Sequence, residues 1–83
     1  MCVLSPETPL LEVHGLLQEI DPTLREVKLF ANGRLEVFDL APDCVLLLHE
    51  ERVKLRLLQP LDWASILYTL TPQGRVAHTI RVD

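Results

Sequence analysis

An Asn-Gly dipeptide, Asn32-Gly33, stands between two segments in which apolar and polar residues alternate, REVKLFANGRLEVFDL (25–40). Asn-Gly flanked by alternation of period two is the strongest short-range signal for a β-hairpin. A two-residue loop would set Leu29 opposite Glu36 and would mix the apolar and polar faces. We therefore predict a three-residue loop, Ala31-Asn32-Gly33, which separates the faces by pairing Val27 with Val37, Leu29 with Leu35 and Lys28 with Glu36.

A second turn signal, Thr71-Pro72-Gln73-Gly74, lies within the C-terminal segment 64–82. Pro at the second position and Gly where a positive φ is needed are typical of a type I turn. We predict a hairpin with a three-residue loop, Pro72-Gln73-Gly74, and one buried face. Its expected pairs are Leu70 with Val76, Tyr68 with His78, Ile66 with Ile80, and Ala64 with Val82.

The segment 44–58, CVLLLHEERVKLRLL, is predicted to be a third hairpin whose loop comes from residues 49–52. Its second face would carry Val45 and Leu47 beside Lys54 and Arg56. The aliphatic stems of the two basic residues can cover part of that apolar surface while their charges stay in water. The remainder would need the sheet's own curl, another element of the chain, or another subunit.

The segment 6–21 is predicted to be an amphipathic helix, because Leu10, Val13, Leu17 and Ile20 recur at helical spacing. Asp21 precedes a proline, which ends a helix. We thus predict a single α+β domain over residues 1–83: an N-terminal helix packed on a curled, mostly antiparallel six-strand meander of three hairpins (25–40, 44–58, 64–82). That meander would be either open or partly closed into a barrel.

The charge, the apolar runs and the cysteine content argue against several classes of function. Twelve acidic residues against eight basic ones give a net charge of −4, and the bases are spread along the chain, which disfavours nucleic-acid binding. No leader peptide or membrane-spanning run is visible, so we predict no membrane association. Two cysteines without C-x-x-C spacing favour a reducing compartment, and we predict a cytoplasmic protein.

Candidate chemical groups are few and have structural explanations. His49, Glu50 and Glu51 could bind a metal with Cys44, yet a zinc site needs about four ligands and the sequence contains no second cluster. His78 opposite Tyr68 is interpreted as a half-buried histidine with a hydrogen-bond partner. We therefore predict no enzyme, no metal site and no cofactor.

The apolar content points instead to a protein partner. Leucine fills eighteen positions and 48% of the residues are apolar, more than a domain of this length can bury. We predict a non-enzymatic protein–protein interaction domain that self-associates, as a homodimer or small homo-oligomer, through a second apolar face. The predicted interface residues are Phe30, Phe38, Val45, Leu47, Lys54, Arg56 and Trp63.

Two alternatives remain open from the residues alone. An acidic inhibitor, antitoxin-like protein or accessory subunit could mask a basic site on another protein, provided that its carboxylates gather on one surface: Glu26, Asp39, Asp43, Glu50 and Glu51. A small-molecule or metal binder could use a barrel mouth near His49 and His78.

Overall fold

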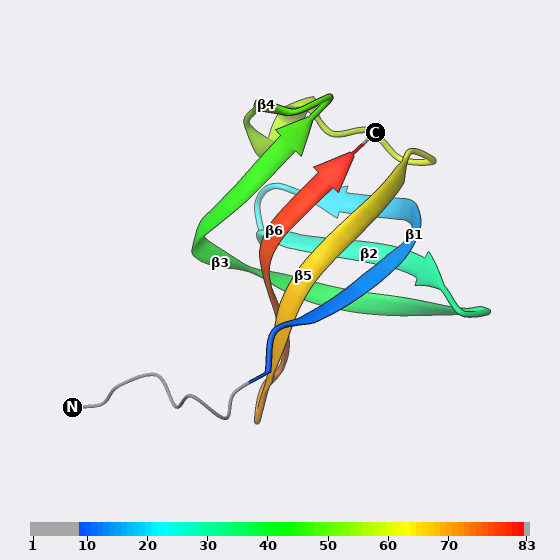
Figure 1. Ribbon diagram of the computed structural model, residues 1–83, viewed down its shortest axis with the longest axis vertical. Helices are drawn as coiled ribbons and strands as arrows, with labels where there is room; N and C mark the ends of the chain where they lie inside the picture. Colours follow the sequence, from blue (N-terminus) through cyan, green and yellow to red (C-terminus); the bar gives the residue numbers. More distant parts are fainter. Residues whose placement is uncertain (1–8, 83) are drawn as a thin grey trace.

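The computed structural model describes residues 9–82 and shows an all-β protein (Figure 1). Its elements are β1 (Leu11–Asp21), β2 (Glu26–Ala31), β3 (Arg34–Leu48), β4 (Glu51–Arg52), the 3-10 turn η1 (Leu55–Leu57), β5 (Trp63–Thr71) and β6 (Gly74–Val82). Within this described range no helix has the length and apolarity that crossing a membrane requires.

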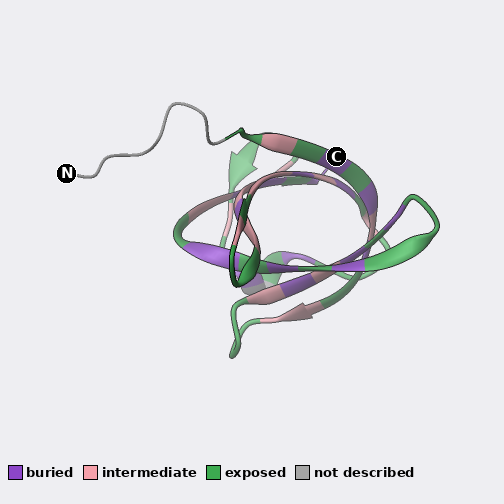
Figure 2. Ribbon diagram, turned by 90° about the horizontal axis from the view of Figure 1, so that it is seen from below, coloured by how far each residue is buried: buried purple, intermediate pink, exposed green. Residues whose placement is uncertain are grey.

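Five of the strands close into a barrel. The hydrogen-bonded order is β2-β1-β5-β6-β3-β4, and an additional β2–β3 pairing joins the two sides of the sheet, with β4 attached outside the ring. All pairs are antiparallel except β3 with β6, which is parallel. Figure 2 shows the strands as a closed ring. The predicted meander order is wrong, because consecutive strands are not all neighbours. Of the two forms left open for the sheet, the open one is also wrong, because closure leaves the ring strands few unpaired edges.

The predicted N-terminal helix is also wrong, and with it the α+β class: residues 11–21 form β1, while residues 6–8 lie outside the described part of the chain. The inward residues of β1 are Val13, Gly15 and Leu17, a period of two. Because Gly15 has no side chain, this period is hidden in the sequence. Val13 and Leu17 fit both the helical period and the strand period, and the pairing of this segment with β2 and β5 makes it a strand.

Gly15 lies where β1 changes partners. Residues 11–16 pair with β5 and residues 16–21 pair with β2, so one bent strand serves both neighbours (Figure 1). A Cβ on Gly15 would collide with the carbonyl oxygen of Phe30 and lie 3.0 Å from the Ala31 Cβ. The glycine therefore allows the backbones of β1 and β2 to approach closely at the bend.

The β2–β3 hairpin has the two-residue loop Asn32-Gly33, although this loop does not separate the apolar residues from the polar ones. Asn32 and Gly33 have φ values of 54° and 80°, as a type I′ turn requires, and Ala31 pairs with Arg34. The register therefore sets Leu29 opposite Glu36, both facing inward, and the predicted pairs of this hairpin are wrong. Turn geometry determined the register here, against the polarity pattern.

The inward carboxylate of Glu36 has ionic partners at the end of the barrel. Arg34 Nε lies 3.7 Å and Arg75 Nε 3.6 Å from its two oxygens, and its side chain is about one-tenth exposed. Paired in this way, a carboxylate can be tolerated inside a barrel wall.

The β5–β6 hairpin has the predicted pairs only at its far end. Ile66 pairs with Ile80 and Ala64 with Val82, as expected, but Thr71 pairs with Gly74 across a two-residue turn. A register shift between Leu67 and Tyr68 restores the predicted pairs beyond it. The unpaired residue is therefore His78, in a β-bulge of β6, and not a third residue of the turn. The predicted Leu70–Val76 and Tyr68–His78 pairs are wrong.

The predicted middle hairpin is mostly absent. Residues 34–48 form one continuous strand, and β4 contributes only two residues before the chain turns into η1. The second half of β3 pairs instead with β6, in parallel. That pairing joins segments more than thirty residues apart in sequence, which local hairpin signals do not reveal.

The β3–β4 turn gives a stability prediction. His49 and Glu50 have φ values of 52° and 70°, so two non-glycine residues occupy left-handed conformations. Asn and Gly are far better suited to such a turn. We expect His49→Asn/Glu50→Gly to raise stability by about 1 kcal/mol, measured by thermal unfolding. Glu51→Gly, placed in β4, should lower it, and a double variant that melts at or below the parent would contradict this account.

Candidate binding surface

A row of four apolar side chains crosses the outside of the barrel on four neighbouring strands. Leu35 of β3 pairs with Phe30 of β2, Phe30 pairs with Leu16 of β1, and Leu16 pairs with Trp63 of β5. Directly paired residues point to the same side of a sheet with their Cβ atoms about 5 Å apart. We call Leu35, Phe30, Leu16 and Trp63 the outer apolar row.

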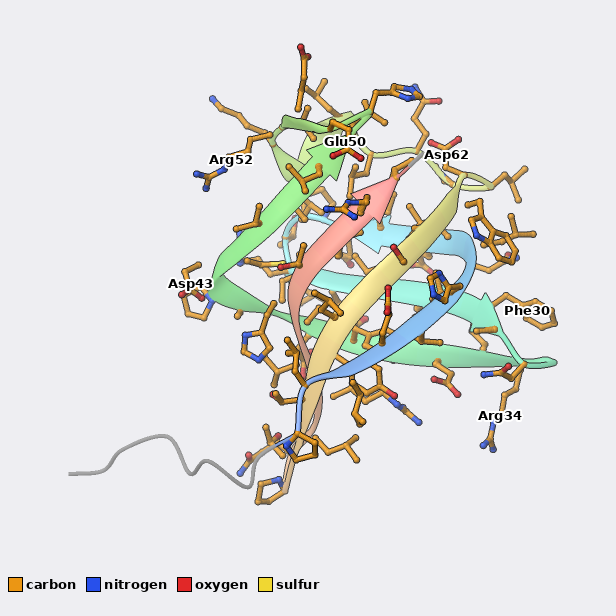
Figure 3. The ribbon with its side chains drawn as sticks, in the orientation of Figure 1. Phe30, Arg34, Asp43, Glu50, Arg52 and Asp62 are labelled. Carbon is orange, nitrogen blue, oxygen red and sulfur yellow. The ribbon has the colours of Figure 1, made fainter. Side chains whose placement is uncertain are left out.

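The row is largely open to solvent. Leu35 is 51%, Phe30 43% and Trp63 53% exposed, while Leu16, between the two aromatic residues, is half-buried. Figure 3 shows Phe30 projecting away from the barrel wall. The other large exposed apolar residues of the described chain lie at turns, at strand ends or on η1, apart from Val37 within β3: Leu10, Leu24, Leu57, Leu61 and Leu70. Contiguous exposed apolar side chains on a small domain are typical of an interaction site.

The row faces outward because the positions beside it fill the interior. Gly15, Leu17, Leu29 and Ala31 alternate with row members along β1 and β2 and are all buried. Since successive side chains of a strand point to opposite sides, Leu16 and Phe30 must then face solvent.

Leu61 adds a strained apolar residue two positions before Trp63. It is 71% exposed and has a φ of 73°, although leucine is poorly suited to the left-handed region. Its N–H donates a hydrogen bond of 2.6 Å to the Leu17 carbonyl, which holds this turn against β1. An exposed leucine in the left-handed region adds little to the stability of the isolated domain, and strained residues of this kind are common at binding sites.

Two further rows run parallel to the outer apolar row on β1, β2 and β3. In the first, Lys28 pairs with Glu19 and with Val37, and its Nζ lies 3.3 Å from a Glu19 carboxylate oxygen. In the second, Glu26 pairs with Asp21 on one side and Asp39 on the other. We call Asp21, Glu26 and Asp39 the acidic row.

The structure brings together only part of the predicted interface. Phe30 and Trp63 lie in one row, whereas Phe38 is fully buried, its ring centroid 5.1 Å from that of Tyr68 and 5.8 Å from the Arg75 guanidinium carbon. Val45 and Leu47 are half-buried on another wall, opposite Thr79 and Arg81. Lys54 is exposed ahead of η1, and the side chain of Arg56 is not among those described.

The predicted self-associating face is therefore not supported. It required Phe38, Val45 and Leu47 to share one outward surface with Phe30, and the barrel separates them. Leu16 and Leu35 are not in the predicted interface, because the sequence predicts a helix at Leu16 and an inward position for Leu35. The Asn-Gly turn, taken as a two-residue loop, would have placed Leu35 beside Phe30 on the outside.

The predicted acidic surface is also divided. Glu26 and Asp39 are neighbours in the acidic row, while Glu50 and Glu51 lie on the β3–β4 turn at the far end of β3. Figure 3 shows Asp43 and Glu50 at separate positions on the molecule. The five carboxylates do not form one patch.

The remaining candidate groups are dispersed as well. The Thr69 hydroxyl and His78 Nε2 lie 2.9 Å apart at the β-bulge, His49 is in the β3–β4 turn, and His14 is on the outside of β1. Burial raises the pKa of Cys44 to about 11, with Asp43 adding to the shift and Arg25 opposing it, so this thiol is protonated at neutral pH. Within residues 9–82, no three His, Cys, Asp or Glu side chains are grouped to hold a metal ion.

The closed five-stranded barrel, with its bent first strand and its parallel β3–β6 pair, is of the OB type. Solved structures of CusF share this fold. Ag(I)-bound CusF superimposes with a TM-score of 0.74 at 10% identity, over 90% of this chain and 99% of that one. Apo-CusF from Escherichia coli gives 0.72 at 11% identity, over 100% and 99%. A second Ag(I)-bound structure from E. coli gives 0.75 at 9% identity, over 94% and 96%.

At these identities the likeness concerns the fold alone. No protein-family model matches the sequence, and neither does any curated protein. The comparisons lend no support to the predicted α+β class, to homo-oligomerisation or to a cytoplasmic location.

Proposed function

We propose that this chain is a non-enzymatic binding domain that docks a protein partner through the outer apolar row. One observation carries the proposal: Leu35, Phe30, Leu16 and Trp63 are direct neighbours on the outside of a barrel that is already closed. Since the interior has its own core, these side chains add little by folding alone and gain burial by contact. Aromatic anchors flanked by smaller apolar side chains are the usual centre of a protein interface.

Transport or capture of Ag(I), the ion named for two of the CusF structures, is not proposed. Soft cations of this kind select thiolate and thioether ligands. In the part of the chain that the structure describes, sulfur is present only in Cys44, whose pKa of about 11 disfavours the thiolate. The three histidines lie on different elements and do not converge.

Site-specific photocrosslinking tests the proposal. A photoreactive phenylalanine analogue placed at Phe30 or Leu35, in cells that express the chain, should give the same discrete adduct with one protein. The analogue at Leu70 is a matched control, because Leu70 is as exposed but lies near the β5–β6 turn. Phe30→Asp should abolish the adduct formed at Leu35. Equal labelling from Leu70 and Leu35, or an adduct that survives Phe30→Asp, would contradict docking through the row.

A further inference from the structure

We infer that the partner segment is amphipathic and basic: apolar side chains that cover the outer apolar row, followed by Lys or Arg that reach the acidic row. This inference rests on the function proposed above and adds the chemistry of the partner. It is carried by the relative placement of the two rows on β1, β2 and β3.

The acidic row brings three carboxylates together without an ionic partner among the described residues. Glu26 lies directly opposite both Asp21 and Asp39, and like charges directly opposite in a sheet are destabilising. Among the described residues, none of the three has a carboxylate oxygen within 4.0 Å of a nitrogen of Lys, Arg or His. Other acidic residues do have such a partner: Glu12, Glu19, Glu36 and Glu50. The neighbouring Arg25 directs its guanidinium to the Ala41 carbonyl, at 3.0 Å. Cations from a partner would relieve this repulsion.

A metal ion does not account for the row. Asp21 Oδ1 accepts hydrogen bonds from the backbone N–H groups of Thr23 and Leu24, at 3.0 and 3.1 Å, so one oxygen is already engaged in the turn. Within the described chain, these three carboxylates are also not grouped in a way that could hold a metal ion. Spread over three strands, the carboxylates suit several basic side chains better than one ion.

The two rows set the spacing of the partner's features. Along β2, Glu26 and Phe30 are four residues apart, which corresponds to about 13 Å of strand. Between them, the Lys28–Glu19 ion pair is internally neutral. A partner helix would bridge about 13 Å with roughly nine residues, so its apolar anchors and its basic residues should lie two to three turns apart.

Single-stranded nucleic acid fits this surface less well. Phe30 and Trp63 could stack bases, as aromatic side chains on OB-type barrels do. Phosphates, however, would have to pass near the acidic row on a chain of net charge −4. The charge pattern therefore favours a basic protein segment.

Trp63 is a built-in reporter, because it is the only tryptophan of the chain and lies in the outer apolar row. Three Trp-free helical peptides of 14 residues serve as probes, each with Leu and Phe anchors in the first two turns. Their last two turns carry Lys and Arg, Gln, or Glu. We expect the basic peptide to shift Trp63 emission to shorter wavelength and to bind most tightly, with an affinity that falls as salt increases.

Substitutions in each row test separately what the acidic row and the outer apolar row contribute to peptide binding. Glu26→Gln/Asp39→Asn should weaken the basic peptide about three- to tenfold, as expected for two exposed charge pairs, and leave the Gln peptide unchanged. It should also raise the melting temperature, because repulsion is removed. Glu50→Gln/Glu51→Gln makes the same change of net charge at the far end of β3 and should leave the basic peptide's affinity unchanged. Phe30→Ala should weaken the basic and Gln peptides alike, by about tenfold or more.

The outcomes are distinguishable. Equal binding of the basic and Gln peptides overturns this inference and leaves the proposed function standing. No shift of Trp63 emission with any peptide overturns both. A shift with oligo-dT that exceeds the one with the basic peptide overturns the inference in favour of nucleic acid. A concentration-dependent dimer, seen by light scattering and removed by Phe30→Ala, overturns it in favour of a second copy.

Discussion

Gly15→Ala should be among the most damaging single substitutions in the barrel. The new Cβ would collide with the Phe30 carbonyl oxygen and crowd the Ala31 Cβ, 3.0 Å away. The carbonyl belongs to the backbone of a strand that pairs on both sides, so β2 cannot give way without breaking hydrogen bonds to β1 or β3. We expect a loss of about 3 kcal/mol in the free energy of unfolding and a fall in melting temperature of roughly 12 °C or more.

Gly33→Ala provides the matched control. A Cβ added at Gly33 would meet no other atom within 4 Å, so the substitution tests only the backbone conformation, with φ at 80°. That cost should be about 1 kcal/mol. Urea unfolding of both variants compares them directly. If Gly15→Ala were no worse than Gly33→Ala, the close approach of β1 to β2 at this bend would be refuted.

Phe38→Ala should destabilise the protein by about 3–5 kcal/mol, comparable with the whole stability of many small domains. Phe38 is fully buried and contacts Tyr68 edge to face across the interior. Truncation leaves a cavity that the barrel cannot close, because its circumference is set by the strand pairings. The variant should be largely unfolded by circular dichroism; Phe38→Leu, which keeps most of the volume, should remain folded with a clearly lowered melting temperature.

Phe30→Ala is the natural comparison, since Phe30 is on the adjacent strand but points outward. Its effect on stability should stay within about 0.5 kcal/mol while its effect on peptide binding is large. Reversed behaviour, with Phe30→Ala unfolding the chain and Phe38→Ala leaving it intact, would show that the inner and outer faces of the β2–β3 hairpin have been exchanged.

The sequence predicts the strands of the two hairpins better than it predicts which side of each strand faces the interior. The presence of strands at 25–40 and 64–82 was predictable from Asn32-Gly33 and from the turn before Gly74. The faces of the first hairpin were predicted wrongly, because sorting by polarity placed Glu36 outside, whereas the two-residue Asn-Gly turn places it inside. Arg75 of β6, 39 residues further along the chain, partly neutralises that buried carboxylate.

The amino-acid sequence by itself determined the local features: the Asn-Gly turn, the alternation of the C-terminal hairpin, the excess of apolar residues and the acidic net charge. These depend on residues close together in the chain. Only the tertiary structure decided that β1 is a strand, that β3 runs parallel to β6, and that Phe30 and Trp63 flank Leu16 on the outside. Closing a barrel satisfies backbone hydrogen bonds between distant segments, and that requirement overrides the local helical pattern in β1 and pairs β3 with β6.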